Sequence, residues 1–171
     1  GVTAQNITPG HLNLIGGKGV GIKTAGMNVE KMVRKSPSSM VFSLEPSSIR
    51  YWAKDSQVEV TLEAAVSMIR NTLDGAKKYL EKSGEYNQRF EALRPLLEGE
   101  VPAIFQANTV EEIRAAMKLS EDFNLRLIVS GGVQAYRLAG DLARANVGVI
   151  LGTGPTHETI RGGGQGYNDE S

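Results

Sequence analysis

The residues best placed to do chemistry follow short apolar segments, at the positions where buried strands would end. Parallel α/β folds bind their ligands at the carboxyl ends of the strands, so the side chains found there are the natural candidates. They are amides, a hydroxyl, a glycine and one carboxylate, which can hold a small polar ligand through hydrogen bonds. The candidates for ligand contact are Gln106, Asn108, Ser130, Gly131 and Glu45.

Histidine and cysteine are too few for the common hydrolytic centres. The chain contains only His11 and His157, and neither has a second histidine at ligand spacing. It contains no cysteine, which excludes thiolate catalysis, zinc–cysteine sites and disulfides. Metal-assisted hydrolysis usually takes three or more imidazole or carboxylate ligands around the ion. We therefore predict neither a metal site nor a cofactor, and we assign no catalytic residue.

Glu45, the glycine-rich residues 16–23 and the glycines at 131 and 132 each also have a purely structural interpretation. Glu45 precedes Pro46 and Ser47, where a helix would begin, so we expect its side chain to serve as a cap. The glycine-rich residues 16–23 match neither a phosphate loop nor a dinucleotide fingerprint, and we expect a turn-rich loop with positive φ at several positions. Glycines 131 and 132 open a helix, where backbone amides can bind an anion, but such loops commonly carry glycine for packing alone.

The elements that position the candidates alternate between strand and helix. Apolar runs predict buried strands at residues 2–7, 40–43, 101–105, 125–129 and 147–151. Apolar stripes at helical spacing predict helices at residues 61–83, 88–97 and 134–146. Another helix is predicted to begin at Thr109, where Thr109 followed by Glu112 has the form of a capping box and Val110, Ile113 and Met117 fall on one face. Such parallel βα units fit either a barrel of the TIM type or an open doubly wound sheet, and the sequence pattern does not separate the two.

Composition limits the partners and the domain count. The 171 residues fit a single domain, with residues 161–171 expected to form a flexible, polar and glycine-rich tail. Nineteen basic residues balance nineteen acidic ones, which gives no electrostatic reason to expect a nucleic acid or a membrane surface as a partner. No apolar run approaches the roughly 20 residues that a membrane-spanning helix needs. We expect a soluble protein, of the cytoplasm or periplasm.

Several stretches, spread over nearly the whole chain, together match the pattern of one known family. They begin with Gly1-Val2-Thr3, the Pro9-Gly10 turn and residues 13–21. They continue with Pro102, Ala107, Glu111-Glu112-Ile113 and residues 119–128, and end with Ala135-Tyr136, Leu142-Ala143 and residues 149–152. In their order and spacing they resemble imidazolonepropionase-like members of the amidohydrolase superfamily. The resemblance implies a metal-dependent (β/α) barrel that hydrolyses amide or cyclic amide bonds. It also implies that the chain is a fragment, corresponding to about strands three to seven of that barrel.

The metal ligands of active relatives do not carry over to this chain. Where the family's fifth strand often ends in His-Ala-His, this sequence reads Gln106-Ala107-Asn108, and Gly131 stands in place of the sixth-strand histidine. Glu45 is displaced from its usual position in the family's Gly-Glu-Asn-Pro segment. The family's His-x-His pair and late aspartate belong to regions outside the resemblance. The zinc of active relatives therefore finds no ligands here.

These observations leave three functions open. The first is an amidohydrolase-related fragment without metal-dependent hydrolysis, and the second is the central part of a larger enzyme acting on C–N bonds. The third is a non-catalytic scaffold or small-ligand-binding protein. In each case, strands taken from a barrel leave two sheet edges with unpaired backbone groups, so we expect a homo-oligomer formed through those edges.

Overall fold

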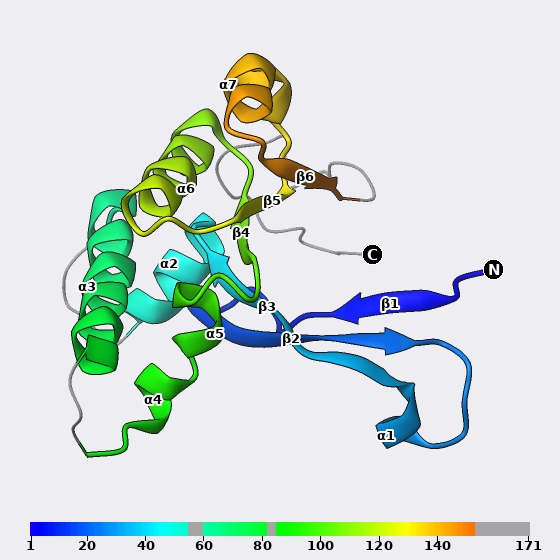
Figure 1. Ribbon diagram of the computed structural model, residues 1–171. Coiled ribbons are helices and arrows are strands. Elements are labelled where there is room, and N and C mark those ends of the chain that lie inside the picture. Colours follow the sequence, from blue (N-terminus) through cyan, green and yellow to red (C-terminus); the bar gives the residue numbers. More distant parts are fainter. Residues whose placement is uncertain (55–59, 82–84, 153–171) are drawn as a thin grey trace, which may run out of the picture.

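The computed structural model describes residues 1–54, 60–81 and 85–152, and within these ranges the chain forms a mixed sheet curled into a half-barrel (Figure 1). The expected tail and His157 lie outside the described residues. Six strands are hydrogen-bonded in the order in which they occur in the sequence. The strands are β1 (Ala4–Ile7), β2 (Ile15–Lys23), β3 (Val33–Ser43), β4 (Ala103–Ala107), β5 (Leu127–Gly131) and β6 (Gly148–Leu151).

Helices connect the parallel strands and cover one face of the sheet. Strands β3, β4, β5 and β6 are all parallel, as the βα pattern predicts, and they form the partial α/β barrel. The helices are α1 (Val29–Met32), α2 (Pro46–Ala53), α3 (Leu62–Glu81), α4 (Gln88–Glu91), α5 (Arg94–Leu97), α6 (Val110–Asp122) and α7 (Ala139–Arg144), with a 3₁₀ turn at Ala135–Leu138. None of the described helices is long and apolar enough to cross a membrane.

Two of the expected helices are divided into shorter elements. Residues 88–97 form α4 and α5 in place of one helix, because Pro95 has no backbone N–H with which to continue the first into the second. Residues 134–146 begin as the 3₁₀ turn and become α-helical only at Ala139. The capping box of α6 is present as expected: Thr109 Oγ1 accepts from the Glu112 N–H, and the Glu112 carboxylate accepts from the Thr109 N–H.

The first three strands form an antiparallel ribbon, and the expectation of a turn-rich loop at residues 16–23 was wrong. These residues belong to β2, which pairs with β1 on one side and β3 on the other. Only Gly17 within this stretch has a positive φ, of 117°. The glycines instead permit close approach, since a Cβ on Gly19 would lie 2.3 Å from Ser39 Oγ. Backbone pairing on both sides therefore overrides the low strand preference of glycine.

The hydrophobic core lies between the helices and the parallel strands. Phe42 of β3 and Phe105 of β4 are fully buried, and their rings stack with centroids 4.7 Å apart and planes within 12°. Helix α3 contributes a buried stripe, and α6 contributes another against β4 and β5. The buried members of those two stripes are Ala65, Ile69, Leu73, Ala76, Ile113, Ala116 and Leu119.

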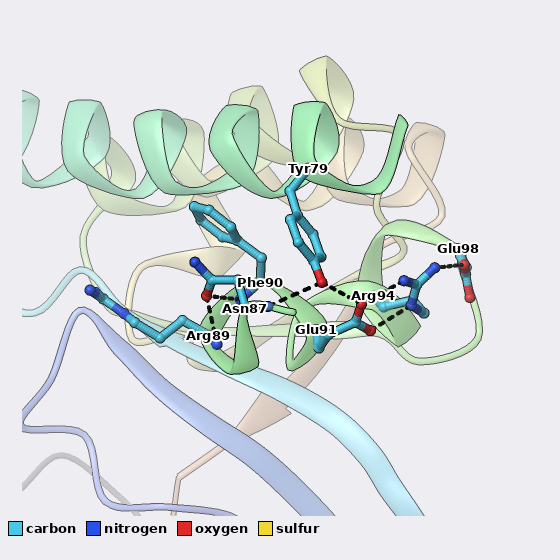
Figure 2. A network of polar contacts seen from close by, with 7 residues as sticks. All are labelled: Tyr79, Asn87, Arg89, Phe90, Glu91, Arg94 and Glu98. Carbon is cyan, nitrogen blue, oxygen red and sulfur yellow. Dashed lines mark hydrogen bonds and ion pairs between the residues drawn. The ribbon is translucent and has the colours of Figure 1, made fainter. Parts of the chain in front are cut away.

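A polar network joins α3 to the short helices α4 and α5 (Figure 2). Glu91 is at its centre: Oε1 accepts from the Tyr79 hydroxyl at 2.9 Å, and both carboxylate oxygens accept from the Arg94 guanidinium at 2.7 and 2.8 Å. Asn87 Oδ1 caps α4 by accepting from the backbone N–H groups of Arg89 and Phe90. The hydrogen bonds from Arg94 and then from Tyr79 lower the pKa of Glu91 from 4.5 to about 2.

This depressed pKa predicts an acid-sensitive contribution to stability. Because the folded state holds the Glu91 carboxylate ionised, its contribution is fully present above about pH 4.5 and is lost as the pH falls towards about 2. Urea unfolding in steps across this range should show wild type losing more stability than Glu91→Gln. Glu111→Gln, a change at an exposed glutamate of α6, is the control and should follow the wild-type profile. Identical profiles for wild type and Glu91→Gln would contradict the assignment.

Candidate functional site: the carboxyl ends of β3, β4 and β5

The register of the parallel strands places Ser43 beside two of the predicted contact residues, Gln106 and Ser130. Ser43 of β3 pairs with Gln106 of β4, and Gln106 pairs with Ser130 of β5. Because residues opposite one another on neighbouring strands point to the same face, these side chains form one row across the sheet. Ser43 is fully buried and its hydroxyl lies 2.6 Å from that of Ser48, which gives it a structural role. Gln106 and Ser130 remain half-buried.

Glu45 turns towards the end of β4, and the expectation that its side chain caps α2 was wrong. It occupies the N-cap position of α2, but its side chain makes no capping hydrogen bond. Its Oε1 instead accepts from Asn108 Nδ2 at 2.5 Å and from Gln106 Nε2 at 3.3 Å. Leaving a half-buried carboxylate and two half-buried amide groups without hydrogen-bond partners would be unfavourable. The two hydrogen bonds from the amides to Glu45 avoid that cost. Three of the five predicted contact residues thus form one cluster, Glu45–Gln106–Asn108, called the rim cluster below.

The backbone of Asn108 is held at both ends by residues that the sequence did not single out for the site. Its N–H donates to Glu112 Oε2 at 2.7 Å, and its carbonyl accepts from the Gln134 N–H at 2.9 Å. Gln134 Oε1 also accepts from the Val110 N–H, which ties the loop before the 3₁₀ turn to the start of α6. Glu112 was recognised only as part of a capping box, and nothing in the local sequence pattern marks Gln134.

Glu112 brings a second carboxylate close to the rim cluster. It is almost fully buried, with 5% of its surface exposed, and burial raises its pKa while the N–H groups of Asn108 and Thr109 act in the opposite direction. The charge of Glu45 also raises the pKa of Glu112, so the two carboxylates repel one another. The Oε2 oxygen of Glu112 is occupied by the backbone N–H groups of Asn108 and Thr109, so this carboxyl group serves to position the loop that carries Asn108.

Gly131 completes the arrangement by the absence of a side chain. Its φ is 89°, and a Cβ there would lie 2.4 Å from Asn108 Oδ1 and 3.0 Å from Gln106 Nε2. The amide of Asn108 thus occupies the space that a side chain at position 131 would need. The N–H of the following Gly132 donates to the Ala107 carbonyl at 2.9 Å, so it is not free to bind an anion.

The residues of this rim do not fit the zinc site that the family resemblance implies. The rim cluster offers one carboxylate and two amides, whereas zinc in proteins is bound by imidazole, thiolate and carboxylate ligands. Position 131, where the family resemblance implies a histidine, has no room for a side chain beside Asn108. His11 is exposed, and its backbone carbonyl accepts from the Ser48 hydroxyl. Within residues 1–54, 60–81 and 85–152, no three histidine, aspartate or glutamate residues gather as a metal site would require.

Comparison with known structures finds a solved protein that is similar to this half-barrel. It matches the crystal structure of an amidohydrolase from Thermotoga maritima with a TM-score of 0.84 and 25% sequence identity. The fold is amidohydrolase-like. The match covers 90% of this chain and 43% of the other, so the chain spans less than half of the length of the solved amidohydrolase. No family model matches the chain, and no curated protein sequence does.

A pocket of about 640 Å³ lies next to the rim cluster in sequence, since its lining includes Leu44 and Thr109. Its other walls come from α2, from the start of α3 and from Glu112 of α6. None of the five predicted contact residues lines it. Because its lining is mainly apolar and Glu112 is already bonded to the backbone, the rim carries the unused polar groups and is the better candidate for polar recognition.

Proposed function

We propose that this chain supplies the central strands of an amidohydrolase-like barrel whose rim binds a small polar ligand and does not carry out zinc-dependent hydrolysis. One observation supports this most strongly: the amides of Gln106 and Asn108 both donate to Glu45, at the strand ends where the family resemblance implies metal-binding histidines. The cluster is positioned by backbone hydrogen bonds to Asn108 and by the missing side chain of Gly131. Such fixed polar groups suit hydrogen-bonded recognition.

The alternative is that the chain forms the middle of a larger hydrolase of C–N bonds. The name of the similar Thermotoga protein and its greater length favour this alternative. In that case Gln106 and Asn108 would contact the substrate, and the reactive groups would come from parts of the barrel beyond these strands.

Elemental analysis combined with hydrolysis assays separates these functions. The chain is purified without chelators, its zinc content is measured, and hydrolysis of acyl amino acids and dipeptides is followed with and without added zinc. We expect no stoichiometric zinc and no hydrolysis above that of a Glu45→Ala, Asn108→Ala double variant. Zinc retained in a one-to-one ratio and lost in the double variant would overturn the proposal.

We also propose that the chain associates with a second copy of itself through the free edge of β6. Strand β2 covers the far edge of β3, so among the described strands the outer edges are those of β6 and β1. β6 carries no charge or proline, and Ile150 and Leu151 are 49% and 72% exposed. An apolar edge without such protection pairs readily, and two identical edges related by a two-fold axis pair antiparallel.

The substitution Ile150→Lys is therefore expected to shift the monomer–dimer equilibrium towards the monomer. A charge on an edge strand disfavours pairing with another edge, while the cost to the fold is small at a half-exposed position. Sedimentation velocity across a wide concentration range should show a concentration-dependent dimer for wild type and less of it for Ile150→Lys. Leu12→Lys introduces the same charge at another exposed site and should leave association unchanged. A wild-type chain that stays monomeric at every concentration would refute the proposal.

A further inference from the structure

We infer that the rim cluster selects ligands that carry a primary ammonium group. This inference rests on the proposed binding function and narrows it to a chemical class. It starts from charge. Within the described residues no lysine, arginine or histidine forms an ion pair with Glu45, whose hydrogen bonds there come from neutral amides. A half-buried carboxylate without a counter-charge attracts a cation.

The unused hydrogen-bonding groups of the rim cluster are all acceptors, which suits a ligand that has only donors, such as an ammonium ion. Glu45 Oε1 already accepts twice, which leaves Oε2 without a hydrogen bond among the described residues. The amide N–H groups of Gln106 and Asn108 must face the carboxylate, so their carbonyl oxygens face elsewhere. Neither of these two oxygens has a hydrogen-bond donor within the described parts of the chain. One anionic and two amide oxygens therefore remain as acceptors, and a ligand that binds to them must supply hydrogen-bond donors, as an ammonium group does.

The same count disfavours other cations. A guanidinium binds best when both carboxylate oxygens are open to its two parallel N–H groups, and here only one is open. Calcium takes six to eight oxygen ligands and magnesium demands octahedral geometry, usually with more than one carboxylate nearby. Glu112 does not supply the second carboxylate ligand, because its Oε2 is held by the backbone N–H groups of Asn108 and Thr109.

Nuclear magnetic resonance titration of the 171-residue chain tests this inference. Ethylammonium, ethylguanidinium, propionate, acetamide and calcium are each added while the side-chain amide signals of Gln106 and Asn108 are followed. We expect ethylammonium to move both signals at the lowest concentration of the five probes. Glu45→Gln, which keeps the shape and removes the charge, should weaken ethylammonium binding about tenfold or more, as the loss of a charge-assisted hydrogen bond predicts.

Two further variants separate charge from damage to the fold. Glu111→Gln removes a charge from an exposed position of α6 and should leave the ethylammonium titration unchanged. Glu45→Asp keeps the charge and should retain measurable binding even if Glu45→Gln perturbs the fold. Equal binding of ethylammonium by wild type and Glu45→Gln would overturn the inference, as would tighter binding of calcium or ethylguanidinium. Binding of acetamide or propionate alone would overturn it while leaving the proposed polar-ligand function standing, and no response to any probe would refute both.

Discussion

Replacing Phe105 by alanine is expected to lower the free energy of unfolding by about 3–5 kcal/mol, the usual cost of deleting a buried aromatic side chain. Phe105 has no exposed surface and its ring stacks on Phe42, so the change removes both burial and an aromatic contact. The position is central as well, because Phe105 pairs with Phe42 of β3 on one side and with Val129 of β5 on the other. The cavity would open beneath the strand that carries Gln106.

Urea denaturation measures this cost, provided that the slope of the transition is unchanged between variants. Tyr86→Ala is the matched control, because this tyrosine is 77% exposed and its loss should change stability by no more than about 0.5 kcal/mol. A loss below about 1 kcal/mol in Phe105→Ala would show that the helices and sheet do not enclose this ring as described. Domains are stable by only about 5–15 kcal/mol, so a loss of the expected size can leave part of the variant unfolded at room temperature. Partial unfolding of Phe105→Ala would therefore agree with the prediction.

The second large effect is expected at Gly131. Alanine there is strained because φ is 89°, and its Cβ would lie 2.4 Å from Asn108 Oδ1. We expect Gly131→Ala to cost about 1–3 kcal/mol, the range for a residue held in a sparsely populated backbone conformation. We also expect the Asn108 amide to move away from Glu45, which would shift the Asn108 side-chain signal in the magnetic resonance spectrum.

Gly140→Ala is a control that is expected to change the free energy of unfolding in the opposite direction. Gly140 lies within α7, and a Cβ there has nothing within 4 Å. Alanine should therefore stabilise the chain by about 0.5–1 kcal/mol through its better helix propensity. If Gly131→Ala stabilised the chain as Gly140→Ala is expected to, the close approach of Asn108 to position 131 would be refuted.

The parallel part of the fold was accessible from the sequence because each signal there is local. Short aliphatic runs, a capping box at Thr109 and apolar stripes at helical spacing define the units from β4 to β6. Since parallel strands bring their carboxyl ends to one edge, the candidates Gln106, Asn108, Ser130 and Gly131 could be grouped before any contact was known. In the structure Gln106, Asn108 and Gly131 lie close together, and the function of the group stays a prediction.

The features that could not be predicted from the sequence depend on contacts between residues that are distant in the chain. The glycines of β2 lower its apparent strand content, and pairing with both neighbours is visible only in three dimensions. The orientation of Glu45 follows from the adjacency of β3 and β4, which lie about sixty residues apart in the chain, as the pair Phe42 and Phe105 shows. Local rules favour a cap at that position, whereas in the fold the side chain of Glu45 accepts from the amides of Gln106 and Asn108.

The long connection between β3 and β4 has a consequence for the order in which the chain folds. The ribbon of β1 to β3 and the unit from β4 to β6 each consist of pairings that are short-range in sequence. Joining β3 to β4 requires closure of the segment that holds α2, α3, α4 and α5. Loop closure becomes more costly in entropy with length, and non-local pairing slows folding. We therefore expect the two local units to form early and the stacking of Phe42 on Phe105 to form late.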